Sequence, residues 1–104
     1  MERIAFTMQL KSGVKDEYKK RHDEIWPEMV AVLKEAGVSD YSIFLDEETG
    51  KLFAVLCRQD GHGMDDLPNK EIVRKWWEWN APLMDVQPDN EPVSKPLEEM
   101  FYLP

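Results

Sequence analysis

Three side chains that could support acid–base or hydrogen-bond chemistry lie four residues apart near the N-terminus: Tyr18, His22 and Trp26. If the segment is one helix, this spacing places the phenol, the imidazole and the indole on a single face. Imidazole titrates closer to neutral pH than any other side chain, so His22 is the candidate general acid or base. The alternative is that all three are ordinary core residues, with the nitrogens of His22 bonded to neighbours.

A second group of candidates is aromatic. Trp76 and Trp77 are adjacent, and on a helix their side chains would point about 100° apart. Such an apolar wall can hold the C–H face of a sugar ring while hydroxyls bind polar groups at the rim. The alternative is that they belong to the core and to an interface. Tyr41, on an expected strand, either offers its hydroxyl to a ligand or is an ordinary half-buried strand residue.

Composition excludes several classes of function. The 104 residues carry 13 Lys and Arg against 21 Asp and Glu, a net charge of -8 that would repel a phosphate backbone. Two histidines and one cysteine cannot form a zinc cluster, and no apolar run approaches the length of a membrane span. We expect one domain over residues 1–104, in the cytoplasm because Cys57 has no disulfide partner, without nucleic-acid, membrane or metal partners.

Hydrophobic periodicity predicts the elements that would position these residues. Alternation over residues 4–10 predicts a strand, and a helical stripe runs from Val14 to about Ala36. Pro27 interrupts this stripe, so a kink or a stop and restart is expected there. A hairpin follows, with strands over residues 41–45 and 52–57.

The second half of the chain is less regular. Asn69 is the expected N-cap of a second helix, whose inward stripe is formed by Ile72, Val73, Trp76, Asn80 and Leu83. Prolines make residues 82–96 a poor place for regular structure, and residues 100–104 are predicted to form a short last strand.

The resulting order, β-α-β-β-α-β, predicts an α+β fold of the ferredoxin-like plan, with both helices on one face of an antiparallel sheet. The other face, which includes Phe44 and Phe53 or their neighbours, has nothing in this chain to cover it. We therefore expect a homodimer, in which a second copy covers this face. The proline-rich tail is expected to help by reaching across.

The chain resembles the L-rhamnose mutarotase family over nearly its whole length. Together, a long H-x-x-I-W-P-E segment, the paired tryptophans and the terminal Tyr-Leu-Pro carry the resemblance. The matching segments are Ala5–Met8, Tyr18–Glu28, Tyr41–Asp46, Leu52–Ala54, Trp76–Trp77, Pro88–Asn90 and Phe101–Pro104. One stretch departs from the family pattern: residues 59–67 are richer in Gly and Asp, which leaves open whether they form a short helix or a lid.

The resemblance implies a dimeric α+β barrel of ferredoxin-like protomers that interconverts the α and β anomers of L-rhamnose without a cofactor. It implies that His22 is the catalytic proton donor and that Tyr18, Tyr41, Trp76 and Trp77 contact the sugar. As a hypothesis, the imidazolium of His22 protonates the ring oxygen, the tyrosines bind hydroxyls and the tryptophans form the wall. The base at the anomeric hydroxyl is not identified, and either a water or a carboxylate would serve.

Other functions remain open at this point. Dimeric ferredoxin-like barrels also include cofactor-free oxygenases, haem-degrading enzymes and small-molecule sensing modules, and the fold alone does not separate them. A non-catalytic sugar-binding module would bind rhamnose without accelerating exchange of its anomers.

Overall fold

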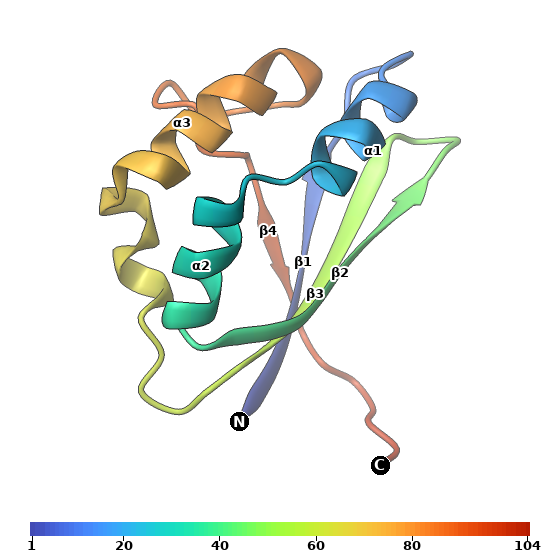
Figure 1. The fold of residues 1–104 in the computed structure, drawn as a ribbon. Coiled ribbons are helices and arrows are strands. Elements are labelled where there is room, and N and C mark those ends of the chain that lie inside the picture. The colour runs from blue at the N-terminus through green and yellow to red at the C-terminus, as the bar shows by residue number, and fades with distance from the viewer.

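The computed structural model describes residues 1–104. It confirms the predicted β-α-β-β-α-β order, with the first helix in two pieces (Figure 1). Two short 3₁₀ helices, η1 and η2, flank the third α-helix. The elements are β1 (Glu2–Gln9), α1 (Lys15–Asp23), α2 (Pro27–Glu35), β2 (Val38–Asp46), β3 (Lys51–Arg58), η1 (Met64–Asn69), α3 (Glu71–Asn80), η2 (Ala81–Leu83) and β4 (Lys95–Leu97).

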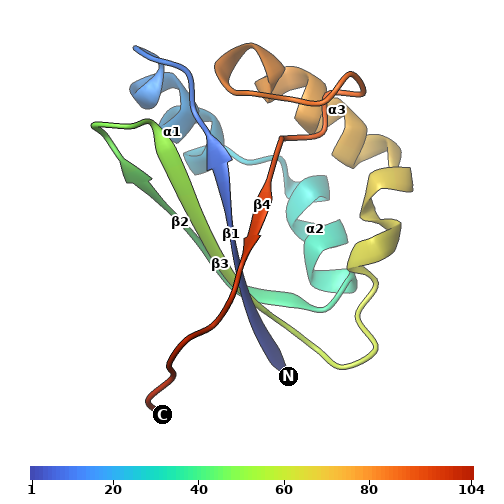
Figure 2. The same cartoon turned by 180° about the vertical axis from the view of Figure 1, so that it is seen from behind.

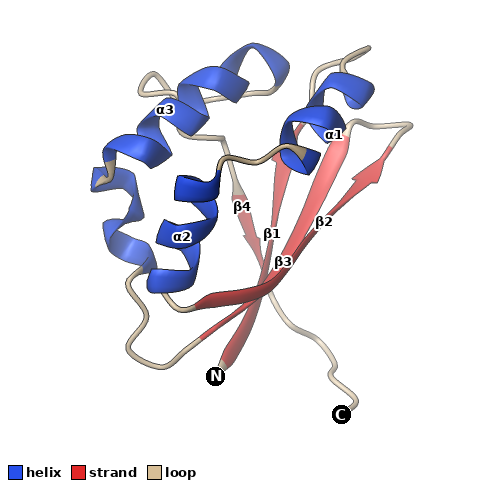
Figure 3. Ribbon diagram, in the orientation of Figure 1, coloured by secondary structure: helices blue, strands red, loops and turns tan.

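The four strands form one antiparallel sheet in the order β2-β3-β1-β4. The helices lie on one face of this sheet, and no helix covers the opposite face (Figures 2 and 3). In the register, Met8 lies opposite Leu52 and Phe6 lies opposite Ala54. These residues share the face toward the helices, because directly paired residues point to the same side of a sheet. The alternation predicted for β1 is therefore confirmed.

The helical stripe stops and restarts at Pro27, one of the two predicted outcomes. Trp26 has extended backbone angles (φ -64°, ψ 136°), and Pro27 occupies the first turn of α2. A proline fits there because the first amides of a helix have no partner inside it. Consequently Trp26 does not lie on the same helix as Tyr18 and His22, and the expectation of three residues on one helical face is wrong for Trp26.

The final strand is also not where the sequence predicted it. β4 pairs with β1, with Leu97 opposite Ala5 and Lys95 opposite Thr7, whereas residues 100–104 form no strand. The prolines did not prevent this pairing because β4 is an edge strand, where a missing N–H is tolerated. The tail is instead placed beside β1, where the guanidinium of Arg3 lies 3.8 Å from the ring centre of Tyr102.

Two smaller expectations about residues 59–70 are resolved as well. Residues 64–69 form the 3₁₀ helix η1, so the Gly- and Asp-rich stretch is loop followed by a short helix. The N-cap of α3 is Lys70 rather than Asn69. Asn69 instead donates from Nδ2 to Asp66 Oδ1 at 3.0 Å within η1.

The buried residues form two clusters. One cluster lies around α1 and includes Leu10, Tyr18, Leu52 and Met84. The other joins α2, α3 and the sheet and includes Met29, Leu56, Val73 and Trp76. α1 and α2 each contribute one buried residue, Tyr18 and Met29, but α2 also packs against β2, α3 and η1, whereas α1 has few contacts with other elements.

Candidate active site

A cavity of about 1050 Å³ opens within the layer between helices and sheet, lined mostly by hydrophobic side chains. All five residues singled out from the sequence line it. Tyr18 and His22 come from α1, Tyr41 comes from β2, and Trp76 and Trp77 come from α3. Residues up to 59 positions apart in the sequence therefore meet around one space.

His22 lies in the last turn of α1, and its geometry defines the state of its ring. Its Nδ1 is 3.0 Å from the carbonyl oxygen of Tyr18. A carbonyl only accepts, so Nδ1 carries the hydrogen and the lone pair of the neutral ring is on Nε2. Burial lowers the pKa of His22 below its usual value, and the hydrogen bond to Tyr18 and the charge of Asp23 oppose this only in part. The neutral imidazole is therefore the favoured form at neutral pH.

The two tyrosines are neutral hydrogen-bond donors. Burial raises the pKa of Tyr18, and the neighbouring Tyr41 raises it further. Tyr41 is 39% exposed as a residue, and desolvation of its hydroxyl raises the pKa of Tyr41 to about 12. The ring of Tyr41 packs edge-to-face on Phe6 with centroids 6.5 Å apart. Both phenols therefore keep their hydrogens and can donate to oxygens of a ligand.

The tryptophans differ in exposure. Trp76 is 7% exposed, and its ring meets His22 at 5.2 Å and Trp26 at 5.1 Å between centroids, both edge-to-face. Trp77 is half-buried and also lines the cavity. Trp26 does not line the cavity, and its ring packs on Trp76, which in turn meets His22.

Asn80 is a buried polar residue of this region that the sequence placed on the inward stripe without a role. It is 4% exposed, and its Nδ2 donates to the carbonyl oxygen of Trp76 at 3.0 Å. Its Oδ1 has no partner within the chain. The spacing of four on a helix was the signal for this bond, since side-chain amides can bond back to the carbonyl one turn earlier.

Comparison with known proteins assigns the chain to a family. The family model described as L-rhamnose mutarotase matches residues 3–103. The chain belongs to the L-rhamnose mutarotase family. An L-rhamnose mutarotase of Mesorhizobium japonicum is 60% identical over 102 residues, covering 98% of this chain and 97% of that protein. One of Sinorhizobium fredii is 55% identical over 103 residues, covering 99% of each.

A solved structure agrees with the fold. The crystal structure of L-rhamnose mutarotase FA22100 from Formosa agariphila superposes with a TM-score of 0.93, at 55% sequence identity and over 100% of both chains. The expected membership of the L-rhamnose mutarotase family and the ferredoxin-like α+β fold are therefore confirmed.

Two further structural facts apply to this L-rhamnose mutarotase family member. No group of three or more His, Cys, Asp or Glu side chains is arranged to hold a metal ion. None of its helices has the length and apolar character required to cross a membrane.

Proposed function

We propose that this chain interconverts the α and β anomers of L-rhamnose. The observation that carries the proposal is the position of His22, whose Nε2 lone pair is the one ring site free for proton transfer, on the wall of a cavity lined by two phenols and two indoles. The names of the relatives support the choice of sugar.

The walls of the cavity suit a pyranose with both polar and apolar faces. The hydroxyls of Tyr18 and Tyr41 donate to oxygens of the sugar, since both groups stay protonated at neutral pH. Trp77 is half-buried and offers apolar surface to the C–H face of the ring. Trp76 is almost fully buried, so its main part is to form the floor against which His22 rests.

Mutarotation requires opening and reclosing of the hemiacetal ring. In the proposed cycle, neutral His22 Nε2 takes the proton of the anomeric hydroxyl. The bond from the anomeric carbon to the ring oxygen breaks, a carbonyl forms, and a water molecule gives a proton to the former ring oxygen. After rotation of the aldehyde group, the proton returns to that water, the oxygen attacks the other face of the carbonyl carbon, and the imidazolium gives its proton back.

This cycle differs in one respect from the role first assigned to His22. The sequence-based hypothesis starts from the imidazolium as donor to the ring oxygen, whereas burial favours the neutral ring. In the proposed cycle His22 is a donor in the closing half of the reaction, and a base in the opening half. One well-placed group of this kind contributes about 10² to 10⁴ in rate.

The experiment is saturation-transfer NMR on L-rhamnose at anomeric equilibrium. We expect the purified protein to exchange the two anomeric proton signals faster than buffer alone, and faster for L-rhamnose than for sugars with another configuration. Line broadening of rhamnose without faster exchange would instead indicate a non-catalytic binding module. If neither faster exchange nor line broadening is observed, both functions are contradicted. An absorption band in the visible region would indicate a haem protein.

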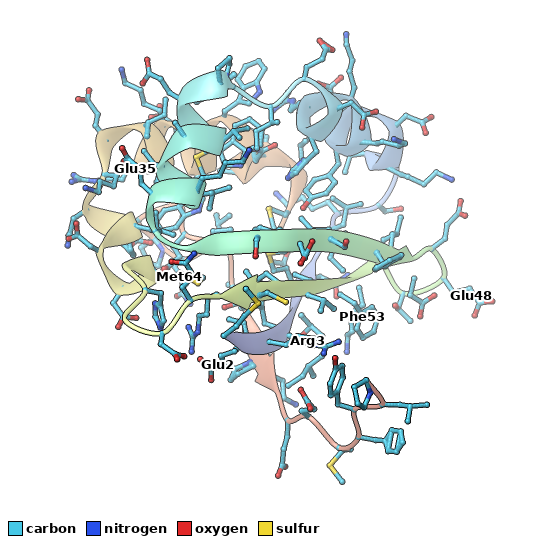
Figure 4. All side chains as sticks on the ribbon, turned by 60° about the horizontal axis from the view of Figure 1, so that its bottom comes forward. Glu2, Arg3, Glu35, Glu48, Phe53 and Met64 are labelled. Carbon is cyan, nitrogen blue, oxygen red and sulfur yellow. The ribbon has the colours of Figure 1, made fainter.

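We also propose that the chain is a homodimer through the uncovered face of the sheet. On this face Phe44 is 65% exposed and Phe53 is 37% exposed, and the two are paired across β2 and β3. Figure 4 shows Phe53 on the side of the sheet away from the helices, the side on which the C-terminal tail lies. Leu97 of β4 adds a further exposed apolar side chain, and such a patch favours a self-complementary partner.

Light scattering after size exclusion tests the dimer. The wild-type protein should elute with twice the mass of one chain, and the double variant Phe44→Lys/Phe53→Lys should elute as a monomer. Glu48→Lys, on the exposed turn between β2 and β3, is the control for added positive charge. A monomeric wild-type protein at micromolar concentration would contradict the proposal.

We further propose a cytoplasmic location. The single cysteine, Cys57, is free and partly buried in β3. The reducing environment of the cytoplasm would keep its thiol intact. Fractionation of the native host with an antibody tests this, and recovery in the periplasmic or secreted fraction would contradict it.

A further inference from the structure

Arg21 joins α1 and α3, the two helices that carry His22 and Trp76. It does so on the outer side of the contact between the His22 and Trp76 rings. Its side chain, on α1, is only 17% exposed. The guanidinium carbon lies 3.9 Å from the ring centre of Trp79 on α3, and NH1 donates to the carbonyl oxygen of Trp79. Arg21 Nε also donates to Glu17 Oε2 at 2.7 Å.

These contacts come from one end of each helix, and their chemistry fits the positions. Trp79 lies in the last turn of α3, where carbonyl groups lack amide partners and carry the negative end of the helix dipole. A planar guanidinium can stack on an indole and donate to a carbonyl at once, which a lysine ammonium cannot do. Glu17, one turn earlier on α1, holds the guanidinium from the other side.

Arg21 and Trp79 lie close in sequence to His22 and Trp76, the two residues whose rings meet at the cavity wall. His22 follows Arg21 on α1, and Trp76 lies three residues before Trp79 on α3. The His22–Trp76 contact on the inside and the Arg21–Trp79 contact on the outside therefore depend on the same spacing between helices.

The other attachments of α1 are few. Tyr18 is its single buried residue, and Lys15 pairs with Glu47 at 2.9 Å in an exposed position, where ion pairs contribute little. Both attachments lie in the first half of α1. The half that carries His22 is held by the contact with α3.

We propose that Arg21 is a positioning residue for the proton transfer, acting on His22 through its clamp on Trp79. The inference rests on the proposed function, because His22 is the proton carrier there. A catalytic group displaced by about 1 Å can cost on the order of 10²-fold in rate. Arg21 does not line the cavity, whereas Tyr41 and Trp77 do, so binding of the sugar should change less than the chemical step.

Four variants test the proposal: Arg21→Ala, Arg21→Lys, Trp79→Leu and, as control, Lys20→Ala. Lys20 is the exposed neighbour of Arg21 and forms no ion pair. From anomer exchange at several rhamnose concentrations, we expect Arg21→Ala to lower kcat by about tenfold or more with a smaller change in KM. Arg21→Lys should recover part of kcat, Trp79→Leu should resemble Arg21→Ala, and Lys20→Ala should match the wild type.

Two further readouts separate this proposal from a structural role and from failure of the proposed function. Thermal melts give the folded fraction, and a kcat loss fully explained by unfolded protein would overturn the proposal, as would unchanged kcat in Arg21→Ala. The NMR signals of the His22 ring, recorded without sugar, report its place beside the rings of Tyr18 and Trp76. They should shift in Arg21→Ala and not in Lys20→Ala, even if the wild-type protein proved inactive on rhamnose, and an unshifted ring would overturn the proposal.

Discussion

The imidazole of His22 meets the indole of Trp76 edge-to-face, with ring centroids 5.2 Å apart. This contact joins the short helix α1, which carries the proposed proton carrier, to α3, which carries the candidate aromatic wall. Because the ring of His22 is also stacked on Tyr18 at 4.2 Å, it is held from two sides, and only Nε2 is left for chemistry.

Replacing His22 should remove catalysis without removing the fold. We expect His22→Asn to lower the rate of anomer exchange by about 10² to 10⁴, while the circular dichroism spectrum stays that of the wild type. His62→Asn is the matched control, since His62 lies in the loop before η1 and does not line the cavity. If His22→Asn unfolds the protein, His22 is a structural core residue rather than the proton carrier.

The pH dependence of the rate reports which protonation state of His22 starts the cycle. Burial lowers its pKa below 6.5, and the proposed cycle requires the neutral form. The rate should therefore rise as the pH increases through this lowered pKa and stay level from about pH 7 upward. A rate that falls over the same range would show that the imidazolium starts the reaction. Exchange measured from pH 5 to 8, with correction for the rate in buffer alone, distinguishes the two.

Substitutions of the two adjacent tryptophans should differ in their effects: that of Trp76 mainly on stability and that of Trp77 mainly on sugar binding. Trp76 is 7% exposed, so Trp76→Ala should lower the free energy of unfolding by about 3 to 5 kcal/mol, measured with urea. Trp77 is half-buried and lines the cavity, so Trp77→Ala should cost less stability and raise KM. Equal losses of stability in the two variants would contradict this division of roles.

Two glycines with similar backbone angles should differ in their tolerance of alanine. Gly50 and Gly61 have φ values of 75° and 72°. A Cβ added at Gly50 would lie 2.8 Å from the carbonyl oxygen of Leu10, whereas a Cβ added at Gly61 would have no atom within 4 Å. Gly61→Ala should cost about 1 to 2 kcal/mol for the left-handed backbone alone. Gly50→Ala should cost more, and the difference in urea midpoints measures the clash. No difference would mean that the turn relaxes freely.

Local rules predicted much of the fold. Alternation in β1, the apolar run of β3 and the proline break before α2 each depend on neighbouring residues, and each was placed correctly. β4 could not be predicted in this way, because its pairing depends on the edge offered by Ala5 and Thr7, about 90 residues earlier. The terminal apolar residues favoured a strand at 100–104, but the pairing with β1 ends at Leu97 opposite Ala5, and residues 100–104 continue without a strand.

The site was predicted to a similar extent. Helical spacing brought Tyr18 and His22 together, residue type made Tyr41, Trp76 and Trp77 candidates, and the resemblance to the family then implied that they contact the sugar. The contact between Arg21 and Trp79 was not predictable, because 58 residues separate the two in sequence and no periodicity links them. The lowered pKa of His22 also required the three-dimensional surroundings, since burial is its main cause.

The break between α1 and α2 separates two roles that one continuous helix would combine: packing against the sheet and setting the direction of His22. An unbroken helix over residues 15–35 would be a rod about 31 Å long, and its packing at Met29 would fix the direction of His22. With a three-residue joint at residues 24–26, the direction of α1 is set by its own contacts with α3 rather than by the packing of α2. We therefore expect changes in the length of this joint to reposition Tyr18 and His22 in the cavity wall without repacking α2 on the sheet, which is a route to admitting a bulkier sugar.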